Sequence, residues 1–242
     1  MADFGIARIG VVTALDWEAS AFVAAGAGPT EPVVETTGPG PAAAAAGAER
    51  AVARGAEVLV SWGSAGALGR VEPGDIVLPP GIVDGQQHRF AADPGLVGIL
   101  AHAFREIAPV HRRDMLSVDS PVTTTARKRR LVDVVGAVAV DMESFAIAEV
   151  AARNGLPLVI VRVIVDGPDH GVPPCAIAGM DGARTRPGRV LAGLLKSPRE
   201  APALLALALA ARRARRTLAA CAAVLPGALA QSARAADTRH DS

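Results

Sequence analysis

Short apolar runs alternate with helical stretches along the first two thirds of the chain. The runs are rich in β-branched residues and predict buried strands at 9–14, 33–37, 57–62, 76–78, 115–118, 138–140 and 158–165. The stretches between them are Ala-rich or helically periodic and predict helices at 16–25, 42–54, 94–107, 126–134 and 142–153. This alternation favours one α/β domain, with a central, mostly parallel twisted sheet flanked by helices.

The pattern changes after Asp166. Residues 167–174 are rich in Gly and Pro and predict a loop, and helices are expected at 187–195 and 198–225. We therefore expect an α/β domain over 1–196 and a C-terminal helical extension over 197–230. The polar residues 231–242 are expected to form a disordered tail.

Composition narrows the class of protein. The 242 residues are 50% hydrophobic, enough for a sizeable core, and the net charge of +1 argues against a nucleic-acid partner. The cysteines, Cys175 and Cys221, and the histidines show no ligand spacing, so neither a metal site nor a structural disulfide is expected. No signal peptide or long apolar span is apparent, which predicts a cytoplasmic location.

Acidic residues follow two of the predicted strands. The run at 138–140 ends in Asp141 and Glu143, and the run at 158–165 ends in Asp166. Parallel α/β sheets bind ligands at the carboxyl ends of their strands. Two strands that deliver carboxylates to one edge of a sheet predict a site for proton transfer or for binding hydroxyl groups.

Four segments in order carry a resemblance to a known family. They are Gly10–Glu18, Trp62–Leu68 with Pro73–Val77, Val140–Ser144 and Arg162–Asp166. Together they resemble the purine nucleoside phosphorylase and nucleosidase superfamily over about residues 6–170. The resemblance implies a nucleoside phosphorylase-like fold, a homo-oligomer, a small-molecule nucleoside substrate and no cofactor, with inorganic phosphate as co-substrate if the protein is a phosphorylase.

The C-terminal third resembles one branch of that superfamily, which is associated with hopanoid biosynthesis. The residues concerned are 182–187, 190–195 and the long Ala/Leu/Arg helix. This implies removal of adenine from adenosylhopane, a membrane-resident substrate. The arginines at 212–216 then have two interpretations: peripheral contact with the inner face of an anionic membrane, or a helix packed on its own domain or on a second subunit.

The resemblance gives the acids chemical roles. Asp166 would be the general acid that protonates N7 of the purine, with a pKa raised by partial desolvation; the alternative is a turn or helix cap. Glu143 would accept hydrogen bonds from the 2′- and 3′-hydroxyls of the ribose, or act only as a first-turn acid. Met142 would pack on the sugar, or simply fill the core.

Glu18 would be the base for an attacking water. Asp16 competes for that role but is better suited to cap the following helix. Arg162 would hold Glu18 or the nucleophile, and a structural ion pair is the equal alternative.

Ser64 and the backbone of Ala65 and Gly66 would line the place of water or phosphate, unless they form only a tight turn. Phosphorylases place arginine where this chain has Ser61 and Trp62, and its first loop is acidic. A phosphate dianion would find few guanidinium partners, so hydrolysis is preferred. Phosphate contacts from Thr123–Thr125 and Arg127 keep phosphorolysis open.

The base pocket departs from the family. Pro121 stands where a Phe usually stacks on the purine, Val122 follows it, and Val165 replaces the Ser before the catalytic Asp. Substrate identity is therefore open. Beside adenosylhopane hydrolysis stand phosphorolysis, a methylthioadenosine/adenosylhomocysteine nucleosidase, and a non-catalytic nucleoside- or lipid-binding protein.

Overall fold

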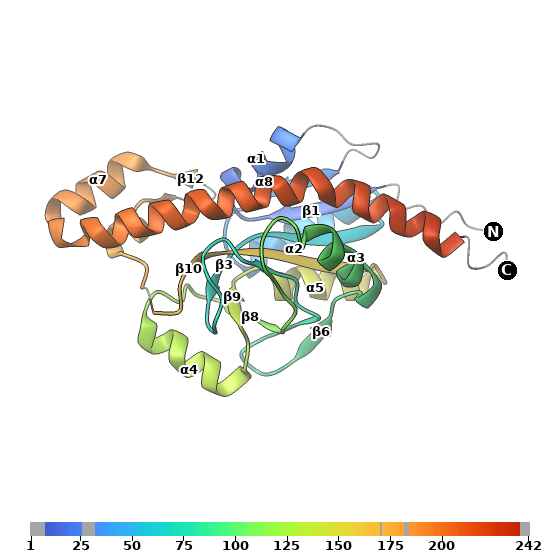
Figure 1. The fold of residues 1–242 in the computed structure, drawn as a ribbon, viewed down its shortest axis with the longest axis horizontal. Helices are drawn as coiled ribbons and strands as arrows, with labels where there is room; N and C mark the ends of the chain where they lie inside the picture. The colour runs from blue at the N-terminus through green and yellow to red at the C-terminus, as the bar shows by residue number, and fades with distance from the viewer. Residues whose placement is uncertain (1–7, 26–31, 170, 182–183, 238–242) are drawn as a thin grey trace.

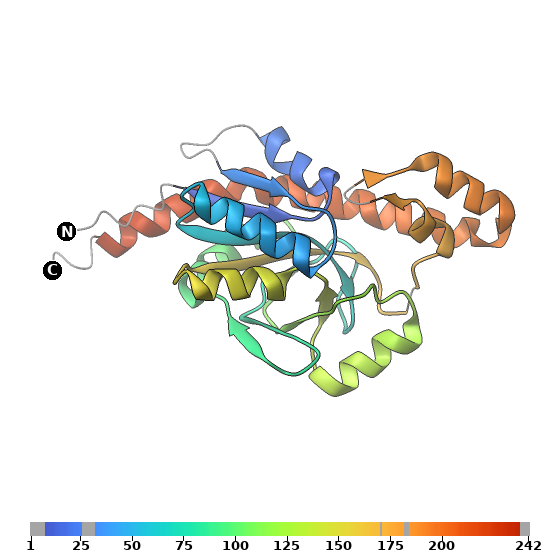
Figure 2. The same ribbon diagram turned by 180° about the vertical axis from the view of Figure 1, so that it is seen from behind.

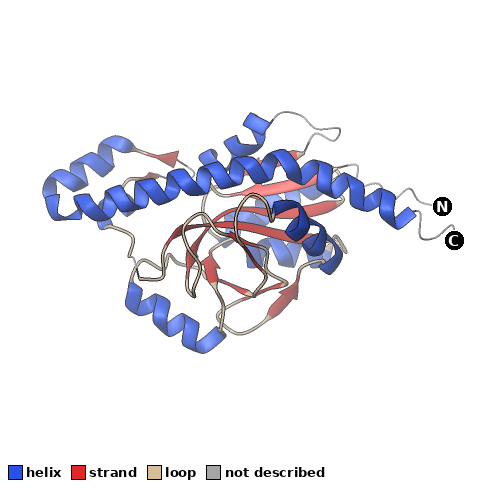
Figure 3. Cartoon of the chain, in the orientation of Figure 1, coloured by secondary structure: helices blue, strands red, loops and turns tan. Residues whose placement is uncertain are grey.

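A computed structural model describes residues 8–25, 32–169, 171–181 and 184–237, and shows a central sheet with helices on both faces (Figures 1 and 3). The ten strands of the sheet are β1 (Ile9–Thr13), β2 (Val33–Thr36), β3 (Val58–Ala67), β4 (Ile76–Val77), β5 (Gly81–Val83), β6 (Arg89–Ala91), β7 (Val110–His111), β8 (Met115–Ser117), β9 (Ala139–Asp141) and β10 (Leu158–Asp166). A small second sheet pairs β11 (Met180–Asp181) with β12 (Arg184–Thr185).

The helices follow the predicted order. They are α1 (Asp16–Ala25), α2 (Pro41–Ala53), α3 (Pro94–Phe104), α4 (Thr125–Val135), α5 (Ser144–Arg153), α6 (Pro174–Ala178), α7 (Pro187–Lys196), the 3-10 turn η1 (Pro198–Glu200) and α8 (Ala201–Asp237). The expected α/β domain with a mostly parallel sheet is confirmed. Strand β3 pairs in parallel with β1 and β10, and within the described part of the central sheet only the β3–β9, β4–β10 and β5–β6 pairs are antiparallel.

The central strands are buried on both faces, which explains why their sequences are almost continuously apolar. Val11, Val60 and Val161 join the core beneath α1, α3 and α8, whereas Leu59 and Ile160 join the core beneath α2 and α5. Figure 2 shows α2 and α5 side by side on the second face.

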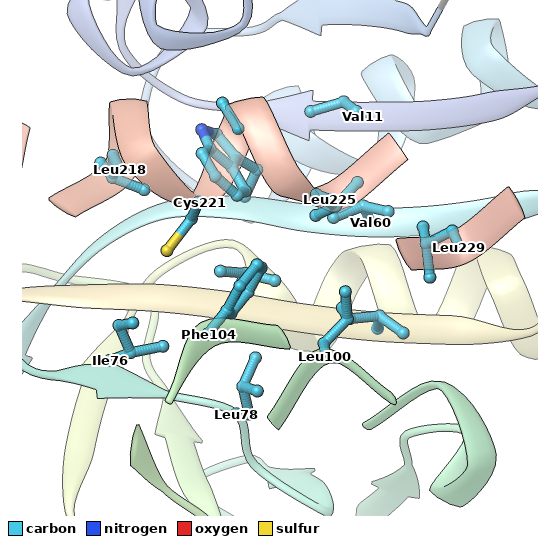
Figure 4. Close-up of a cluster of buried hydrophobic side chains, with 14 of the residues drawn as sticks. Val11, Val60, Ile76, Leu78, Leu100, Phe104, Leu218, Cys221, Leu225 and Leu229 are labelled. Carbon is cyan, nitrogen blue, oxygen red and sulfur yellow. The ribbon is translucent and has the colours of Figure 1, made fainter. Parts of the chain in front are cut away.

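Helix α8 is part of the core along its middle. Leu218, Cys221, Leu225 and Leu229 are fully buried and face Leu100 and other residues of the first core (Figure 4). Helix α8 therefore shares a hydrophobic core with the α/β domain, although the sequence analysis placed a domain boundary between residues 196 and 197. It also continues to Asp237, through part of the range expected to be a disordered tail, because the alanines after Pro226 favour helix; residues 238–242 lie outside the described residues. Within the described ranges, no helix combines the length and the apolarity that a membrane crossing requires.

The Gly63–Gly66 segment differs from expectation. We weighed a tight turn against a pocket-lining role for Ser64, Ala65 and Gly66; these residues form no turn but continue β3 as far as Ala67. A Cβ on Gly63 would lie only 2.8 Å from Glu18 Oε2, so glycine is needed for this strand to pass the carboxylate. The sequence also gave no sign of the short strands β5, β6 and β7, which are too brief for a readable period.

Candidate active site

An open pocket lies at the carboxyl end of β3, and every residue predicted for catalysis or substrate binding lines it; Thr123–Thr125 and Arg127, considered as phosphate contacts, are not among its lining residues. Counted out to its mouth, its empty space is about 790 Å³. The predicted residues on its wall are Glu18, Ser64, Ala65, Gly66, Pro121, Val122, Met142, Glu143, Arg162 and Asp166. Residues far apart in the chain therefore share one cavity.

The two strands that end in acidic residues run in opposite directions, which the sequence did not predict. We expected two parallel strands to deliver their carboxylates to one edge, but β9 runs antiparallel to β3 while β10 runs parallel to it. Val140 pairs with Gly66 from one side, and Asp166 pairs with Gly66 from the other. A Cβ on Gly66 would lie 3.1 Å from Asp166 Oδ1, so this glycine leaves room for the carboxylate.

Glu18 is buried at 2% exposure, and both of its carboxylate oxygens are hydrogen-bonded. Thr13 Oγ1 and the amide of Leu15 donate to Oε2 at 2.8 and 3.1 Å. The amide and the hydroxyl of Ser64 donate to Oε1 at 2.8 and 2.6 Å. Trp62 Nε1 donates to the carbonyl of Glu18 at 3.2 Å and fixes the start of α1 against β3. The carboxylate is thus held rigidly by neutral donors, two of which are hydroxyls that can turn toward a water.

Arg162 contacts a different acid from the one proposed. Its Nε donates to Asp141 Oδ2 at 2.8 Å, and its Nη2 donates to Ser61 and Ser144 at 2.8 and 3.0 Å. Arg162 and Asp141 are both buried. The contacts therefore match the structural ion pair that we considered as the alternative, and among the described residues Glu18 is not one of the hydrogen-bond partners of Arg162.

Glu143 has a strongly perturbed ionisation. Burial, followed by the nearby charge of Asp141, raises the pKa of Glu143 to about 7, although Arg162 and the amide of Gly40 act in the opposite direction. That amide donates to Oε1 at 2.8 Å and the amide of Met142 donates to Oε2 at 3.2 Å. Glu143 occupies the N-cap position of α5, but its side chain makes no capping bond. Its carboxylate lies against the pocket and not over the helix end.

Asp166 has a cationic partner that the sequence analysis missed. Lys128, on α4, places its Nζ against Asp166 Oδ2 in a buried ion pair and donates to the carbonyl of Gly167 at 2.8 Å. The only sequence signal is that Lys128 shares a helix face with Leu131 and Val132. Because Arg127, Arg129 and Arg130 flank Lys128, the sequence favours a solvent-exposed charge at this position.

Part of the pocket lining is apolar. It contains Val118, Pro121, Val122, Val165 and Val172. Arg127, on α4, donates from its two terminal nitrogens to the carbonyl of Pro121 and to Ser120 Oγ, both at 3.0 Å, and so holds the segment that contains Pro121. The described residues of this part of the lining thus offer aliphatic surface to a ligand.

The charges around the pocket are unevenly balanced. Arg162, which lines the pocket, is paired with Asp141, and the buried Lys128 is paired with the lining residue Asp166. Glu18 and Glu143 have no cationic partner among the described residues that are within ion-pair distance. No group of three His, Cys, Asp or Glu side chains in the described ranges is placed to hold a metal ion. The pocket therefore suits neutral hydroxyls and water better than a second anion.

Comparison with known proteins places the chain among relatives of this architecture. The sequence model described as the phosphorylase superfamily matches residues 19–196. No curated protein matches the chain in sequence.

Solved structures share the fold. A 5′-methylthioadenosine/S-adenosylhomocysteine nucleosidase from Neisseria meningitidis, in complex with methylthio-immucillin-A, is 19% identical, with a TM-score of 0.66 over 90% of this chain and 99% of that one. The corresponding nucleosidase of Helicobacter pylori is 19% identical, with a TM-score of 0.63 over 68% and 87%. The futalosine hydrolase of Helicobacter pylori is 18% identical, with a TM-score of 0.62 over 84% and 97%.

Proposed function

The chain belongs to the phosphorylase superfamily, and from the geometry of its pocket we propose that it hydrolyses the N-glycosidic bond of a 5′-substituted adenosine and releases adenine. The observation that carries this proposal is the convergence of Glu18, Glu143 and Asp166 on one pocket. The architecture is shared with nucleosidases that act on methylthioadenosine, adenosylhomocysteine and futalosine.

Each acid has a place in the reaction. Asp166 lies beside Gly66 at the far end of β3 and delivers the proton that N7 of the leaving purine needs. Glu143 accepts hydrogen bonds from the ribose hydroxyls, and these bonds strengthen as the sugar becomes cationic. Glu18 takes a proton from the attacking water.

Water is preferred to phosphate because of the charge around Glu18. Its hydrogen-bond donors are neutral, and the two nearby cations are already paired with Asp141 and Asp166. A phosphate dianion would therefore meet an anion and find no available guanidinium in the described part of the pocket. Phosphorolysis of the same substrate is the competing proposal.

The substrate we propose is adenosylhopane. The open mouth of the pocket fits a nucleoside with a bulky apolar 5′ group. The competing substrates are methylthioadenosine and adenosylhomocysteine. A non-catalytic binding protein is disfavoured, because it would have no use for a buried Glu18 held in place by several donors.

Adenine release decides among these proposals. Purified protein is incubated with each nucleoside, with and without inorganic phosphate, and adenine and the sugar product are quantified. We expect adenine to be released without phosphate, and the sugar product to carry a hydroxyl group and not a phosphate at C1′. Strict phosphate dependence would establish phosphorolysis, and no release from any adenosine derivative would leave only the binding protein.

We further propose that α7 and the first half of α8 contact an anionic membrane surface. Leu191, Leu195, Leu205 and Leu209 are 56–74% exposed, with Lys196 and Arg212 exposed on the same two helices. Two arginines of the cluster contact the domain itself: Arg213 donates to the carbonyl of Pro73 at 3.4 Å and Arg215 stacks on Trp17 at 5.6 Å. Binding to vesicles of anionic lipid tests this contact; a dimer that buries these leucines is the alternative.

A further inference from the structure

Two segments that are far apart in the chain are joined beside the pocket. The amide of Val172 donates to the carbonyl of Thr123 at 3.0 Å. A Cβ on Gly171 would lie 2.9 Å from the same carbonyl oxygen, so a side chain at this position would force the two backbones apart. Pro121 and Val122 on the first segment and Val172 on the second all line the pocket. We call these three lining residues the aliphatic wall.

Arg127 holds the first segment from outside the pocket. Its two terminal nitrogens donate to the carbonyl of Pro121 and to Ser120 Oγ, both at 3.0 Å. Its own amide donates to Thr124 Oγ1 at 3.3 Å, so the first turn of α4 and the guanidinium group hold the segment at different points. Arg127 is not a lining residue of the pocket. Its effect on a ligand there is therefore indirect and passes through the aliphatic wall.

The aliphatic wall suits the base of a nucleoside better than its sugar. The faces of a purine are apolar, whereas ribose presents hydroxyl groups that need hydrogen-bond partners. Asp166, the acid proposed to protonate the base, lines the same pocket. Burial of apolar surface is favourable by roughly 25 cal/mol per Å². This contribution falls if the two segments separate, because water then reaches the contact.

We propose that Arg127 and Gly171 are positioning residues that hold the aliphatic wall together as a binding surface for the leaving base. The identity of that base as adenine rests on the proposed hydrolase function. Arg127 acts through its two hydrogen bonds, and Gly171 acts by letting the backbone of Thr123 approach. In this assignment the guanidinium group of Arg127 orders the wall and does not bind phosphate.

The affinity for adenine tests the proposal without any turnover. Calorimetric titration of Arg127→Met and of Gly171→Ala with adenine gives Kd, and steady-state assays give KM and kcat. We expect each change to raise Kd and KM on the order of tenfold, because the loosened segment must be ordered again when the base binds. We expect kcat to fall much less, since Glu18, Glu143 and Asp166 keep their partners. Misfolding would instead lower the apparent kcat and leave Kd and KM unchanged.

The double variant distinguishes one shared surface from two unrelated effects. Because both changes loosen the same wall, Arg127→Met combined with Gly171→Ala should raise Kd by less than the product of the single effects. Effects that simply multiply would overturn the shared role. Arg130→Met removes an exposed cation from α4, and Gly85→Ala adds a methyl group in open space between β5 and β6. Both controls should leave Kd and kcat unchanged.

This inference and the proposed function fail separately. A wild-type protein that releases no adenine from any nucleoside would refute the hydrolase function. An active wild type whose Arg127→Met and Gly171→Ala variants bind adenine as tightly as wild type would refute this inference alone. Loss of phosphate-dependent turnover in Arg127→Met, with adenine affinity unchanged, would assign Arg127 to phosphate instead and would also refute it.

Discussion

Glu143→Gln should make the protein more stable at alkaline pH while it weakens catalysis. The pKa of Glu143 is about 7 in the folded protein, against 4.5 for an ordinary glutamate, because burial and Asp141 disfavour its charge. Between these values the folded protein holds a proton that the unfolded chain releases. The contribution of Glu143 to stability therefore falls as pH rises from 4.5 to 7.

The magnitude follows from the same two values. One pKa unit corresponds to about 1.4 kcal/mol, so the ionised carboxylate costs roughly 3 kcal/mol of folding free energy above pH 7. At pH 5 most of that cost is absent. The amide of glutamine still accepts from Gly40, but its NH₂ group would face the donating amide of Met142, which removes part of the gain.

Chemical denaturation at pH 5 and pH 8 measures the effect. The free energy of unfolding of Glu143→Gln relative to wild type should rise by roughly 2–3 kcal/mol between the two pH values. Glu149→Gln, an exposed change on α5, should show no such difference. A relative stability of Glu143→Gln that is the same at pH 5 and pH 8 would refute the assignment of a destabilising buried charge.

Four shorter predictions follow from the same geometry. KM should fall as pH rises through 7, because only ionised Glu143 accepts fully from ribose hydroxyls, and Glu143→Gln should abolish that dependence. Glu18→Gln should lower kcat by about 10²-fold or more with little change in KM, in steady-state assays. Arg162→Met should cost roughly 3–5 kcal/mol in urea unfolding, and Asp141→Asn in the same chain should restore part of it. Burial raises the pKa of Cys221 to about 12, so this thiol should resist Ellman's reagent until the protein unfolds.

The sequence was informative where one residue type has one structural meaning. Apolar β-branched runs identified β1, β3 and β10, and the acids at strand ends identified the residues that line the pocket. Pairing direction was beyond its reach, since β9 is only three residues long and its antiparallel course depends on where it meets β3. The ion-pair partner of Arg162 was not predictable either, because nothing in the sequence indicates that it contacts Asp141 rather than Glu18.

The cations, more than the acids, decide what this pocket can do. Had Arg162 reached Glu18, the site would offer a guanidinium group to an anionic nucleophile; instead Arg162 pairs with Asp141. Lys128 is buried against Asp166, whereas Arg129 and Arg130 on the same helix are exposed. Each buried cation at the site is therefore held by an acid, and neither is placed within ion-pair distance of Glu18.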